Sequence, residues 1–290
     1  MPSRKAISTS IQRIKHAPKL PPRPADGHKG LFGRVLIVGG HDSMIGAPVL
    51  AGNAALRMGS GLVQVGMPAE VLAIGLSIVP ELIGLGLSSK KTSDAELRDA
   101  ANSADALAIG PGLGQSSAAG RRVDLLGKMS KPLVVDADGL NHLAKKGSWQ
   151  LKADAVLTPH PGEMKRLIAP LGIKEVPGDD ADRISLAIFA SREFKQVLVL
   201  KGHRTVVTDG RSVYVNDTGD SSLSKAGAGD VLTGIIVSLM GQKMSPLEAA
   251  CAGVHLHGLA GEIAGKMLGR RCVLARDVIN AIPQTIAELE

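Results

Sequence analysis

A run of very small residues followed by one acid is the strongest chemical signal in this sequence. Lys225-Ala226-Gly227-Ala228-Gly229-Asp230 precedes an apolar segment, residues 235–240, that is predicted to be helical. Small residues at a helix start leave backbone N–H groups accessible at the positive end of the helix dipole, where phosphate binds. Asp230 fits two interpretations, a helix cap or a general base that removes a hydroxyl proton. Four short residues before a single acid favour the base.

Other small or polar residues directly follow short apolar runs. Three glycines in Gly110-Pro111-Gly112-Leu113-Gly114 would let the backbone approach a ligand closely. His160 lies between two prolines and has little freedom, which favours a functional role. Asp136 and Asp138 either cap a helix or serve a site. Residues 39–47 lack the G-x-G-x-x-G spacing of dinucleotide-binding loops and fit a plain strand-to-helix turn, and the chain contains no Gly-Lys-Ser/Thr of the Walker A type.

The elements that must position these residues are short β-branched runs that alternate with Ala- and Gly-rich segments. Continuous apolar runs are typical of parallel strands covered by helices on both faces. A helix is expected over residues 47–58. Ligands of such sheets bind beyond the carboxyl ends of the strands, where the residues above lie. Strands are expected at residues 35–38, 62–65, 106–109, 133–135, 155–157 and 197–200.

The pattern changes after residue 200. Thr205–Thr208 and Ser212–Val215 flank Asp209-Gly210, which predicts a β-hairpin because Asp-Gly supplies a tight turn. From Gly229 onward the chain is predicted to be helical. The sequence therefore indicates one α/β domain over residues 25–290, with a mixed, mainly parallel sheet.

Composition excludes several classes of protein. With 44% hydrophobic and 21% charged residues in 290, the chain is not a disordered one. The net charge of +7 comes mostly from residues 1–30, which hold seven bases and one acid, so the body is no nucleic-acid platform. Only five aromatic residues are present, too few for base stacking. Residues 1–24, which end in a proline-rich stretch, are predicted to be a basic, solvated leader and linker.

Cysteine use and hydropathy bear on the compartment. Cys251 and Cys272 have no metal-site spacing, which is typical of reduced thiols in a cytosolic protein. The N-terminus has no apolar segment of a secretory signal. The most apolar stretch, Val71 to Leu87, is interrupted by Pro80 and Glu81 and falls short of a membrane span. A cytoplasmic enzyme is expected.

Gly-Ala-Gly-Asp before a late helix resembles the anion-hole motif of the ribokinase-like superfamily. Further segments narrow the resemblance to the ADP-dependent NAD(P)H-hydrate dehydratases over roughly residues 27–289. Six motifs in this order are specific, although each is weak alone. The other segments are Gly46-Ala47-Pro48, Gly110-Pro111-Gly112-Leu113-Gly114, Val135-Asp136-Ala137-Asp138-Gly139-Leu140-Asn141, Leu157-Thr158-Pro159-His160-Pro161-Gly162-Glu163 and Leu200-Lys201-Gly202-His203-Arg204-Thr205.

The resemblance implies a ribokinase-like α/β fold, with a central, mainly parallel sheet between two layers of helices, a β-hairpin and a helical C-terminal third. It also implies the repair of NADH and NADPH whose nicotinamide ring has taken up water at C6. These enzymes phosphorylate the hydroxyl of the S epimer with ADP, and phosphate then leaves with a push from the ring nitrogen, giving NAD(P)H, AMP and phosphate. The family's epimerase half has no room here, so the stand-alone form is expected.

The same resemblance assigns roles to individual residues. Asp230 is the implied base on the C6 hydroxyl, and the amides of Gly227, Ala228 and Gly229 form the implied anion hole. The residues implied to bind the hydrated nucleotide are Ala47, Gly112, His160 and Asp230. The residues implied to hold the AMP moiety of the phosphate donor are Lys201, Gly202, His203, Arg204, Thr205 and Gly229.

Cofactors and partners follow from the resemblance as well. Mg²⁺ is expected, with ADP as phosphate donor and ATP as the alternative donor. Kinases of the superfamily often use Asn-x-x-Glu near magnesium, and Glu163 of His160-Pro161-Gly162-Glu163 is the equivalent candidate here. Many family members carry Asn-Pro-Gly-Met after a Thr-Gly, where this chain has Asp220-Ser221-Ser222-Leu223. A separate NAD(P)H-hydrate epimerase is the expected functional partner, and a homo-oligomer, a tetramer by resemblance, is the expected assembly.

Two other functions compete with the dehydratase. A small-molecule kinase of the same superfamily, acting on a vitamin-precursor alcohol, would share Asp230 and the anion hole but would not need His160 or the Gly112 loop. A non-catalytic nucleotide sensor would keep the fold, yet a pure binder gains nothing from an acid that faces phosphate. No nucleic-acid or membrane partner is expected for the protein.

Overall fold

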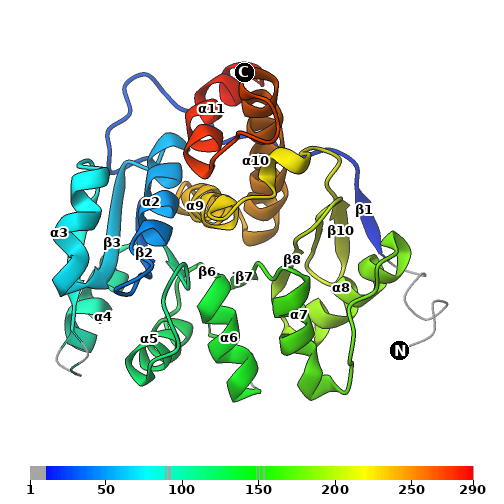
Figure 1. Cartoon of the computed structure of the whole chain (residues 1–290), viewed down its shortest axis with the longest axis horizontal. Helices are drawn as coiled ribbons and strands as arrows, with labels where there is room; N and C mark the ends of the chain where they lie inside the picture. Colours follow the sequence, from blue (N-terminus) through cyan, green and yellow to red (C-terminus); the bar gives the residue numbers. More distant parts are fainter. Residues whose placement is uncertain are drawn as a thin grey trace.

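One mixed sheet organises the protein, for which a computed structural model describes residues 11–289 except 89, 91, 92, 148, 150 and 153. The strand order is β1-β10-β9-β8-β7-β6-β5-β2-β3-β4 (Figure 1). Neighbouring strands run parallel except at β9, which is antiparallel to both β8 and β10. The strands are β1 Gln12–Ile14, β2 Arg34–Val38, β3 Leu62–Pro68, β4 Ile83–Leu87, β5 Ala106–Ile109, β6 Leu133–Val135, β7 Ala155–Leu157, β8 Val197–Leu200, β9 Val206–Thr208 and β10 Ser212–Val215.

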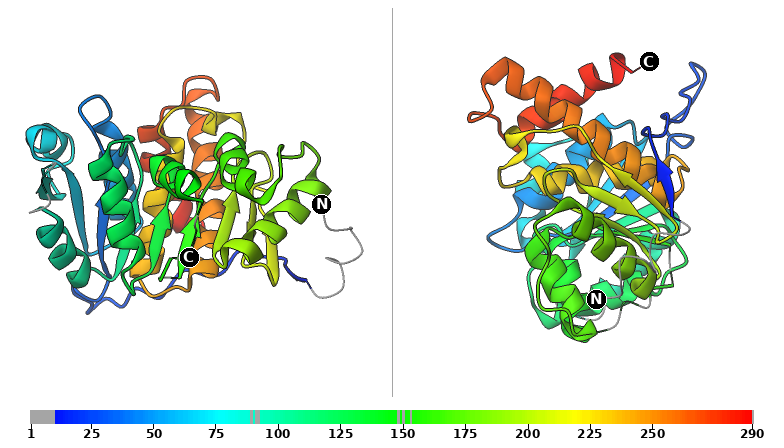
Figure 2. Two further views of the ribbon diagram at one scale, coloured as in Figure 1. Left: turned by 90° about the horizontal axis from the view of Figure 1, so that it is seen from below. Right: turned by 90° about the vertical axis from the view of Figure 1, so that its right-hand side faces the viewer.

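Helices cover both faces of the sheet (Figure 2). Successive side chains of β2 point to opposite faces of the sheet, and those of residues 35–38 are all apolar, so both faces need a cover. Val35 and Ile37 belong to one buried core, whereas Leu36 and Val38 belong to the other. The first core packs under α2, α9, α10 and α11, and the second under α4 to α8. The helices are α2 Gly46–Arg57, α3 Ala69–Ile78, α4 Ser93–Ser103, α5 Ser117–Gly127, α6 Ala137–Lys146, α7 Pro161–Ile168, α8 Asp180–Phe194, α9 Ala228–Gly241, α10 Pro246–Leu268 and α11 Ala275–Ala287.

The predicted architecture is confirmed. Each of the six expected strands is present within a few residues of its predicted range, and so are the helix near residues 47–58 and the helical C-terminal third. The hairpin forms as expected, with Val213 paired to Thr208. The apolar stretch from Val71 to Leu87 is divided between α3 and the edge strand β4. None of the helices in the described part of the chain is long and apolar enough to cross a membrane.

The segment predicted to be a solvated leader contains a strand instead. β1 pairs in parallel with β10, matching Arg13 with Val213, and extends the sheet beyond the hairpin. Ile14 and Leu20 pack against the buried core, and the Arg23 side chain donates to the Gly59 carbonyl at 2.8 Å. The expectation of a solvated leader is therefore wrong for residues 12–14, which form a sheet strand, because backbone pairing at an open sheet edge needs no apolar pattern. Residues 1–10 lie outside the described residues.

Deleting residues 1–24 is expected to lower the melting temperature while changing kcat/KM of the folded protein less than about tenfold, or roughly 1.4 kcal/mol. Stability falls because β1 and the packed side chains behind it are lost. Catalysis is expected to persist because the segment holds none of the predicted site residues. Thermal melting and steady-state kinetics on the same preparation check both parts. A larger drop in kcat/KM, measured well below the melting temperature, would place this segment in the site.

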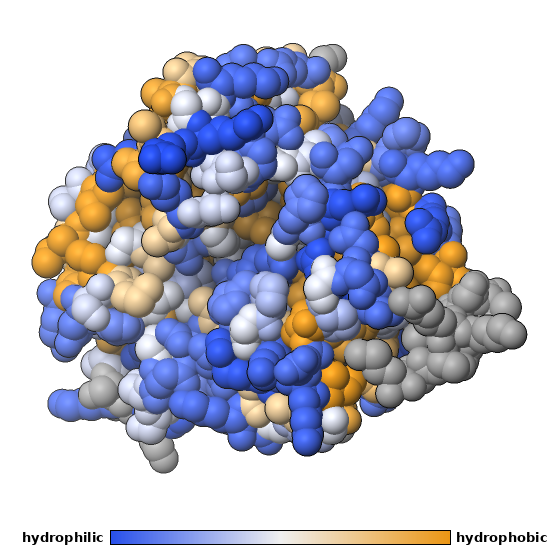
Figure 3. Space-filling model, turned by 45° about the vertical axis from the view of Figure 1, so that its right-hand side comes forward, coloured by the Kyte–Doolittle hydropathy of each residue, from blue (hydrophilic) through white to orange (hydrophobic). Residues whose placement is uncertain are grey.

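One face of the molecule carries mostly polar side chains. Figure 3 shows hydrophilic side chains over most of one face, with smaller apolar areas between them. Exposed apolar side chains of α3 and β4 include Ile74, Ile78 and Ile83. Buried polar groups gather at the carboxyl ends of the strands, among them Asp136, Thr158 and Glu163.

Candidate functional site

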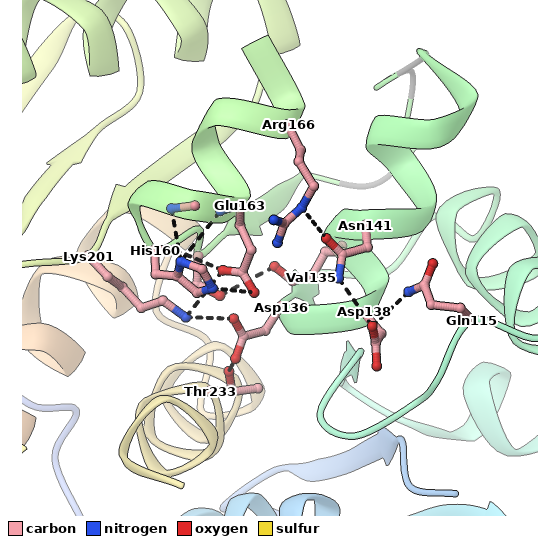
Figure 4. A network of polar contacts seen from close by, with 12 residues as sticks. Gln115, Val135, Asp136, Asp138, Asn141, His160, Glu163, Arg166, Lys201 and Thr233 are labelled. Atoms are coloured by element: carbon pink, nitrogen blue, oxygen red, sulfur yellow. Dashed lines mark hydrogen bonds and ion pairs between the residues drawn. The ribbon is translucent and has the colours of Figure 1, made fainter. Parts of the chain in front are cut away.

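Three neighbouring strands end in the polar residues of the candidate site. Asp136 directly follows β6, His160 lies three residues after β7, and Lys201 directly follows β8. Because β6, β7 and β8 are adjacent and parallel, these residues meet at one edge of the sheet. Figure 4 shows their side chains turned toward one another, with Thr233 approaching from α9. The edge predicted from the sequence is the one where they converge.

A buried ion pair forms the centre of this cluster. The Lys201 ammonium Nζ lies 2.9 Å from Asp136 Oδ1, and the Thr233 hydroxyl donates to Asp136 Oδ2 at 2.8 Å. The Asp136 side chain is only 2% exposed. It occupies the cap position of α6 but makes no capping hydrogen bond, so the capping interpretation of Asp136 is wrong. The sequence left both a capping role and a site role open for Asp136, and it did not identify Thr233.

Glu163 and His160 support each other at the start of α7. Glu163 Oε2 accepts a hydrogen bond from the His160 amide at 2.8 Å, and His160 Nδ1 accepts one from the Gly162 amide at 3.0 Å. Glu163 Oε2 also lies 3.8 Å from Lys201 Nζ. This capping box orients the His160 ring, which is half exposed and turned to the open side of the cluster.

The charges in this cluster shift one another's pKa values. Burial opposes ionisation of both partners of the central pair, yet their mutual attraction prevails, so the pKa of Asp136 is lowered and that of Lys201 raised. Burial raises the pKa of Glu163, which also faces the Asp136 carboxylate. Burial and the Lys201 charge lower the pKa of His160 and favour the neutral ring. The pair is therefore charged at neutral pH, and His160 is neutral.

The start of α9 holds the three residues predicted to form the anion hole, and two of their amides are free of partners among the described residues. No hydrogen bond within the described part of the chain uses the amides of Gly227, Gly229 or Asp230, whereas the Ala228 amide donates to the Lys225 carbonyl at 3.3 Å. Gly227 has φ +89°, and a Cβ there would lie 2.8 Å from Leu50 Cδ1, so a larger residue would force the turn open. The free amides next to the positive helix end suit a phosphoryl group.

Asp230 lies on the first turn of α9, beside these amides. Burial, together with the nearby carboxylates of Asp136 and Glu163, raises the pKa of Asp230 to about 7, and the Lys201 charge offsets this only in part. A general base works best with a pKa near the working pH, because it is then both substantially ionised and basic. Asp230 therefore has the electrostatic environment of a base at neutral pH.

A cavity of about 580 Å³ opens beside the anion hole. Its size suits a small nucleotide. It is lined by every residue predicted to hold the AMP moiety. Further lining residues come mainly from the segment between β10 and α9, part of which the sequence comparison had already singled out at Asp220 to Leu223, and from α10. The added lining residues are Asn216, Thr218, Gly219, Asp220, Ser221, Leu223, Ser224, Leu232, Val254, His257 and Gly258.

Side chains of α8 contact the loop from Lys201 to Thr205 and hold it in place. Arg183, which is buried, donates to the His203 carbonyl at 2.6 Å. Arg204 is half exposed and lies 3.2 Å from Asp180. Arg204 therefore lines the cavity and also contacts α8. Lys201 lines the cavity and also pairs with Asp136 of the carboxylate cluster.

The residues predicted to bind the hydrated nucleotide come from two neighbouring regions. Gly112 has φ +59°, and a Cβ there would lie 3.1 Å from Ala47 Cβ, so Gly112 and Ala47 are neighbours. The Gly112 loop is anchored by Asp138, which accepts hydrogen bonds from the Gly114 amide at 2.9 Å and the Gln115 side chain at 2.7 Å (Figure 4). Asn141 donates a hydrogen bond to Asp138 and accepts one from Arg166 of α7.

Comparison with known proteins gives a consistent result. The family model for NAD(P)H-hydrate dehydratase matches residues 35–284. A bifunctional NAD(P)H-hydrate repair enzyme of Moorella thermoacetica is 43% identical over 285 residues, which covers 94% of this chain but 52% of that protein. The chain thus spans about half the length of such two-part relatives. An ADP-dependent (S)-NAD(P)H-hydrate dehydratase of Neisseria meningitidis is 35% identical and is covered over 97% of its length, as is 98% of this chain.

Solved structures show the same fold. A ribokinase-like superfamily protein of Enterococcus faecalis superposes with a TM-score of 0.81 at 25% identity, covering 93% of this chain and 92% of that one. The ADP/ATP-dependent NAD(P)H-hydrate dehydratase of Bacillus subtilis, co-crystallised with ATP and Mg²⁺, has a TM-score of 0.79 at 30% identity, covering 93% and 95%. The predicted ribokinase-like fold is confirmed.

Proposed function

Because this chain belongs to the NAD(P)H-hydrate dehydratase family, we propose that it uses ADP to dehydrate the S epimers of C6-hydrated NADH and NADPH. The β-phosphoryl group of ADP passes to the C6 hydroxyl oxygen, and AMP departs. The C6–O bond then breaks with phosphate as leaving group and the ring nitrogen as electron donor, and loss of a proton from the adjacent carbon restores NADH or NADPH. The products besides the restored cofactor are AMP and phosphate.

The observation that carries this proposal is the placement of Asp230. Its carboxyl group has a pKa of about 7 and lies on the helix turn whose free amides suit a phosphoryl group. A base and an anion hole on one turn let a hydroxyl lose its proton while it attacks phosphorus. A site for binding alone would be weakened by this acid, because it repels phosphate.

The two groups of site residues divide the work in this proposal. The cavity with Lys201, Gly202, His203, Arg204 and Thr205 binds the AMP moiety, and its phosphates point to Gly229. The region of Ala47, Gly112 and His160 binds the hydrated nucleotide, so that its C6 hydroxyl reaches Asp230. Lys201 lies between the two groups and neutralises charge near the transferred phosphoryl group.

The carboxylates near the proposed phosphate site suit a magnesium ion whose other ligands are mainly the phosphates of the nucleotide. In the described part of the chain no three His, Cys, Asp or Glu side chains are arranged to hold a metal ion by themselves, and Glu163 uses one carboxylate oxygen to cap α7. Mg²⁺ commonly binds through one or two carboxylates together with substrate phosphates. When bound, the ion would neutralise charge developing on the phosphates. Glu163 is the carboxylate proposed to hold it, directly or through water.

We expect the pure protein to restore NADH from its hydrate with ADP, more efficiently than with ATP, and only with a divalent cation. The return of absorbance at 340 nm measures the restored dihydronicotinamide ring. The hydrate should be supplied as separate R and S epimers, because only the S epimer is expected to react. Failure of the folded protein with both donors would contradict the proposal.

The competing kinase function predicts a different product. A kinase acting on an alcohol would leave a stable phosphate ester, whereas the dehydratase releases inorganic phosphate and AMP together. Assaying both products in one reaction distinguishes the two functions. In the proposed function a separate epimerase supplies the S epimer, and the tetrameric assembly stays a prediction from the family resemblance.

A further inference from the structure

A buried histidine in the nucleotide cavity has no role in the sequence-based prediction. His257 lies in α10, lines the cavity beside Ala228 and Gly258, and is 8% exposed. Its Nε2 is buried and has no hydrogen-bond partner among the described residues. A buried polar atom without a partner costs free energy, so an unpaired one inside a ligand cavity indicates a group that the ligand completes.

The protonation of the ring can be deduced from its contacts. The Ala228 backbone favours the protonated ring of His257, which is the effect of a carbonyl acceptor beside a ring nitrogen. Since Nε2 has no partner, the donor is Nδ1–H. Burial, aided by the Lys201 charge, lowers the pKa of His257 to about 4, so the ring is neutral at physiological pH. A neutral ring with its proton on Nδ1 presents Nε2 as a bare acceptor.

An acceptor requires a donor on the ligand, and this restricts which part of ADP it can meet. Phosphate oxygens at neutral pH only accept hydrogen bonds, whereas the ribose hydroxyls and the adenine amino group can donate. The ring lines the cavity together with Ala228, the first residue of α9, and the start of that helix is proposed to bind the phosphates. The ribose is joined directly to the phosphates, whereas the adenine amino group lies at the far end of the nucleotide.

We propose that His257 Nε2 accepts a hydrogen bond from a ribose hydroxyl of the bound nucleotide. This inference rests on the proposed function, because it assumes that the cavity holds a nucleoside diphosphate. It adds a sugar-recognition contact, on α10, to the residues of the Lys201–Thr205 loop. A site built to hydrogen-bond a hydroxyl discriminates against analogues that lack it, because its buried acceptor is then left unpaired.

The test compares the binding of ADP, 2′-deoxy-ADP and 3′-deoxy-ADP to the wild-type protein by calorimetry. We expect one of the two deoxy analogues to bind roughly three- to tenfold more weakly than ADP. In His257→Asn the shorter amide can still donate to the Ala228 carbonyl but no longer reaches the sugar. This variant should bind ADP more weakly than the wild type does, by about the same factor. It should bind the affected deoxy analogue about as well as the wild type does.

His255→Asn is the matched control, since His255 lies on the same helix, contacts Tyr214 and does not line the cavity. It should retain the discrimination. Equal binding of all three nucleotides by the wild type would overturn the inference, and that comparison needs no variant. A loss seen only with inosine diphosphate, which lacks the amino group, would also overturn it by moving the contact to the base. Failure of the folded wild type to bind ADP at all would contradict the proposed function itself.

Discussion

Asp230→Asn is expected to reduce kcat by about 10²- to 10⁴-fold while ADP still binds. Asparagine has nearly the same size and can occupy the first turn of α9 without disturbing it. It also removes a negative charge beside the phosphates, so ADP affinity should be unchanged or slightly higher. The amide cannot accept the proton of the C6 hydroxyl, and turnover therefore collapses. Turnover and the ADP-induced shift in melting temperature, measured on one preparation, check the two halves.

The pH dependence gives an independent check on Asp230. Since its pKa is raised to about 7, kcat/KM of the wild type should rise as pH increases through 7. Stability should change in the opposite sense, because the unfolded state releases this proton near pH 4 and the folded state retains it until about pH 7. The contribution of Asp230 to stability is thus fully present below pH 4 and is lost as pH rises through 7. At pH 8 the Asn variant should therefore melt at a higher temperature than the wild type.

Asp105→Asn is a suitable control for this experiment. Asp105 precedes β5 at the opposite end of the sheet, where it accepts a hydrogen bond from the Arg34 amide at 2.9 Å. Losing its charge should affect stability alone and leave turnover near the wild-type value. The cap position of α9 is Gly227, without a side-chain capping bond, so near-normal turnover of Asp230→Asn would leave Asp230 only the role of an acid on the first helical turn. Loss of the ADP-induced shift together with turnover would mean that Asp230 organises the whole pocket.

The sequence predicted the strands that are buried on both faces and missed those at the sheet edges. β5 and β6 are continuous apolar runs, which only a covered parallel strand explains well. β4 reads Ile83-Gly84-Leu85-Gly86-Leu87, and its glycines weaken any strand pattern. β1 has three residues, two of them charged or polar, and is held by backbone bonds to a strand about 200 residues away. Such pairing leaves no local trace in one sequence.

In the candidate site, too, the sequence identified residues that carry a local signal and missed contacts that depend on the tertiary structure. Lys201, His160 and Asp230 could be identified because each follows a strand or opens a helix, which are local features. The partnership of Lys201 with Asp136 spans 65 residues and depends on how two side chains turn at adjacent strand ends. His257 lies within a long, mostly apolar helix, and the sequence does not reveal which of its faces borders a cavity.

Lys201→Met is expected to lower the free energy of unfolding by about 3 to 5 kcal/mol and to weaken ADP binding by about tenfold to a hundredfold. Asp136 is 2% exposed, so removing its cation leaves an uncompensated buried carboxylate, which the hydroxyl of Thr233 contacts but cannot neutralise. The loss of a positive charge near Asp230 should also raise the pKa of that base and move the rise in kcat/KM to higher pH. Chemical denaturation, calorimetry and a pH profile measure the three effects.

Adding Asp136→Asn to Lys201→Met separates structure from binding. The asparagine still accepts the hydrogen bond from Thr233 but needs no cation, so most of the lost stability should return. The pKa of Asp230 should move back toward its wild-type value, because a charge that raises it and a charge that lowers it have both been removed. The affinity for ADP should stay low, since no ammonium group faces the phosphates. If ADP affinity recovered together with stability, Lys201 would serve only to neutralise Asp136, and the binding role proposed for it would be wrong.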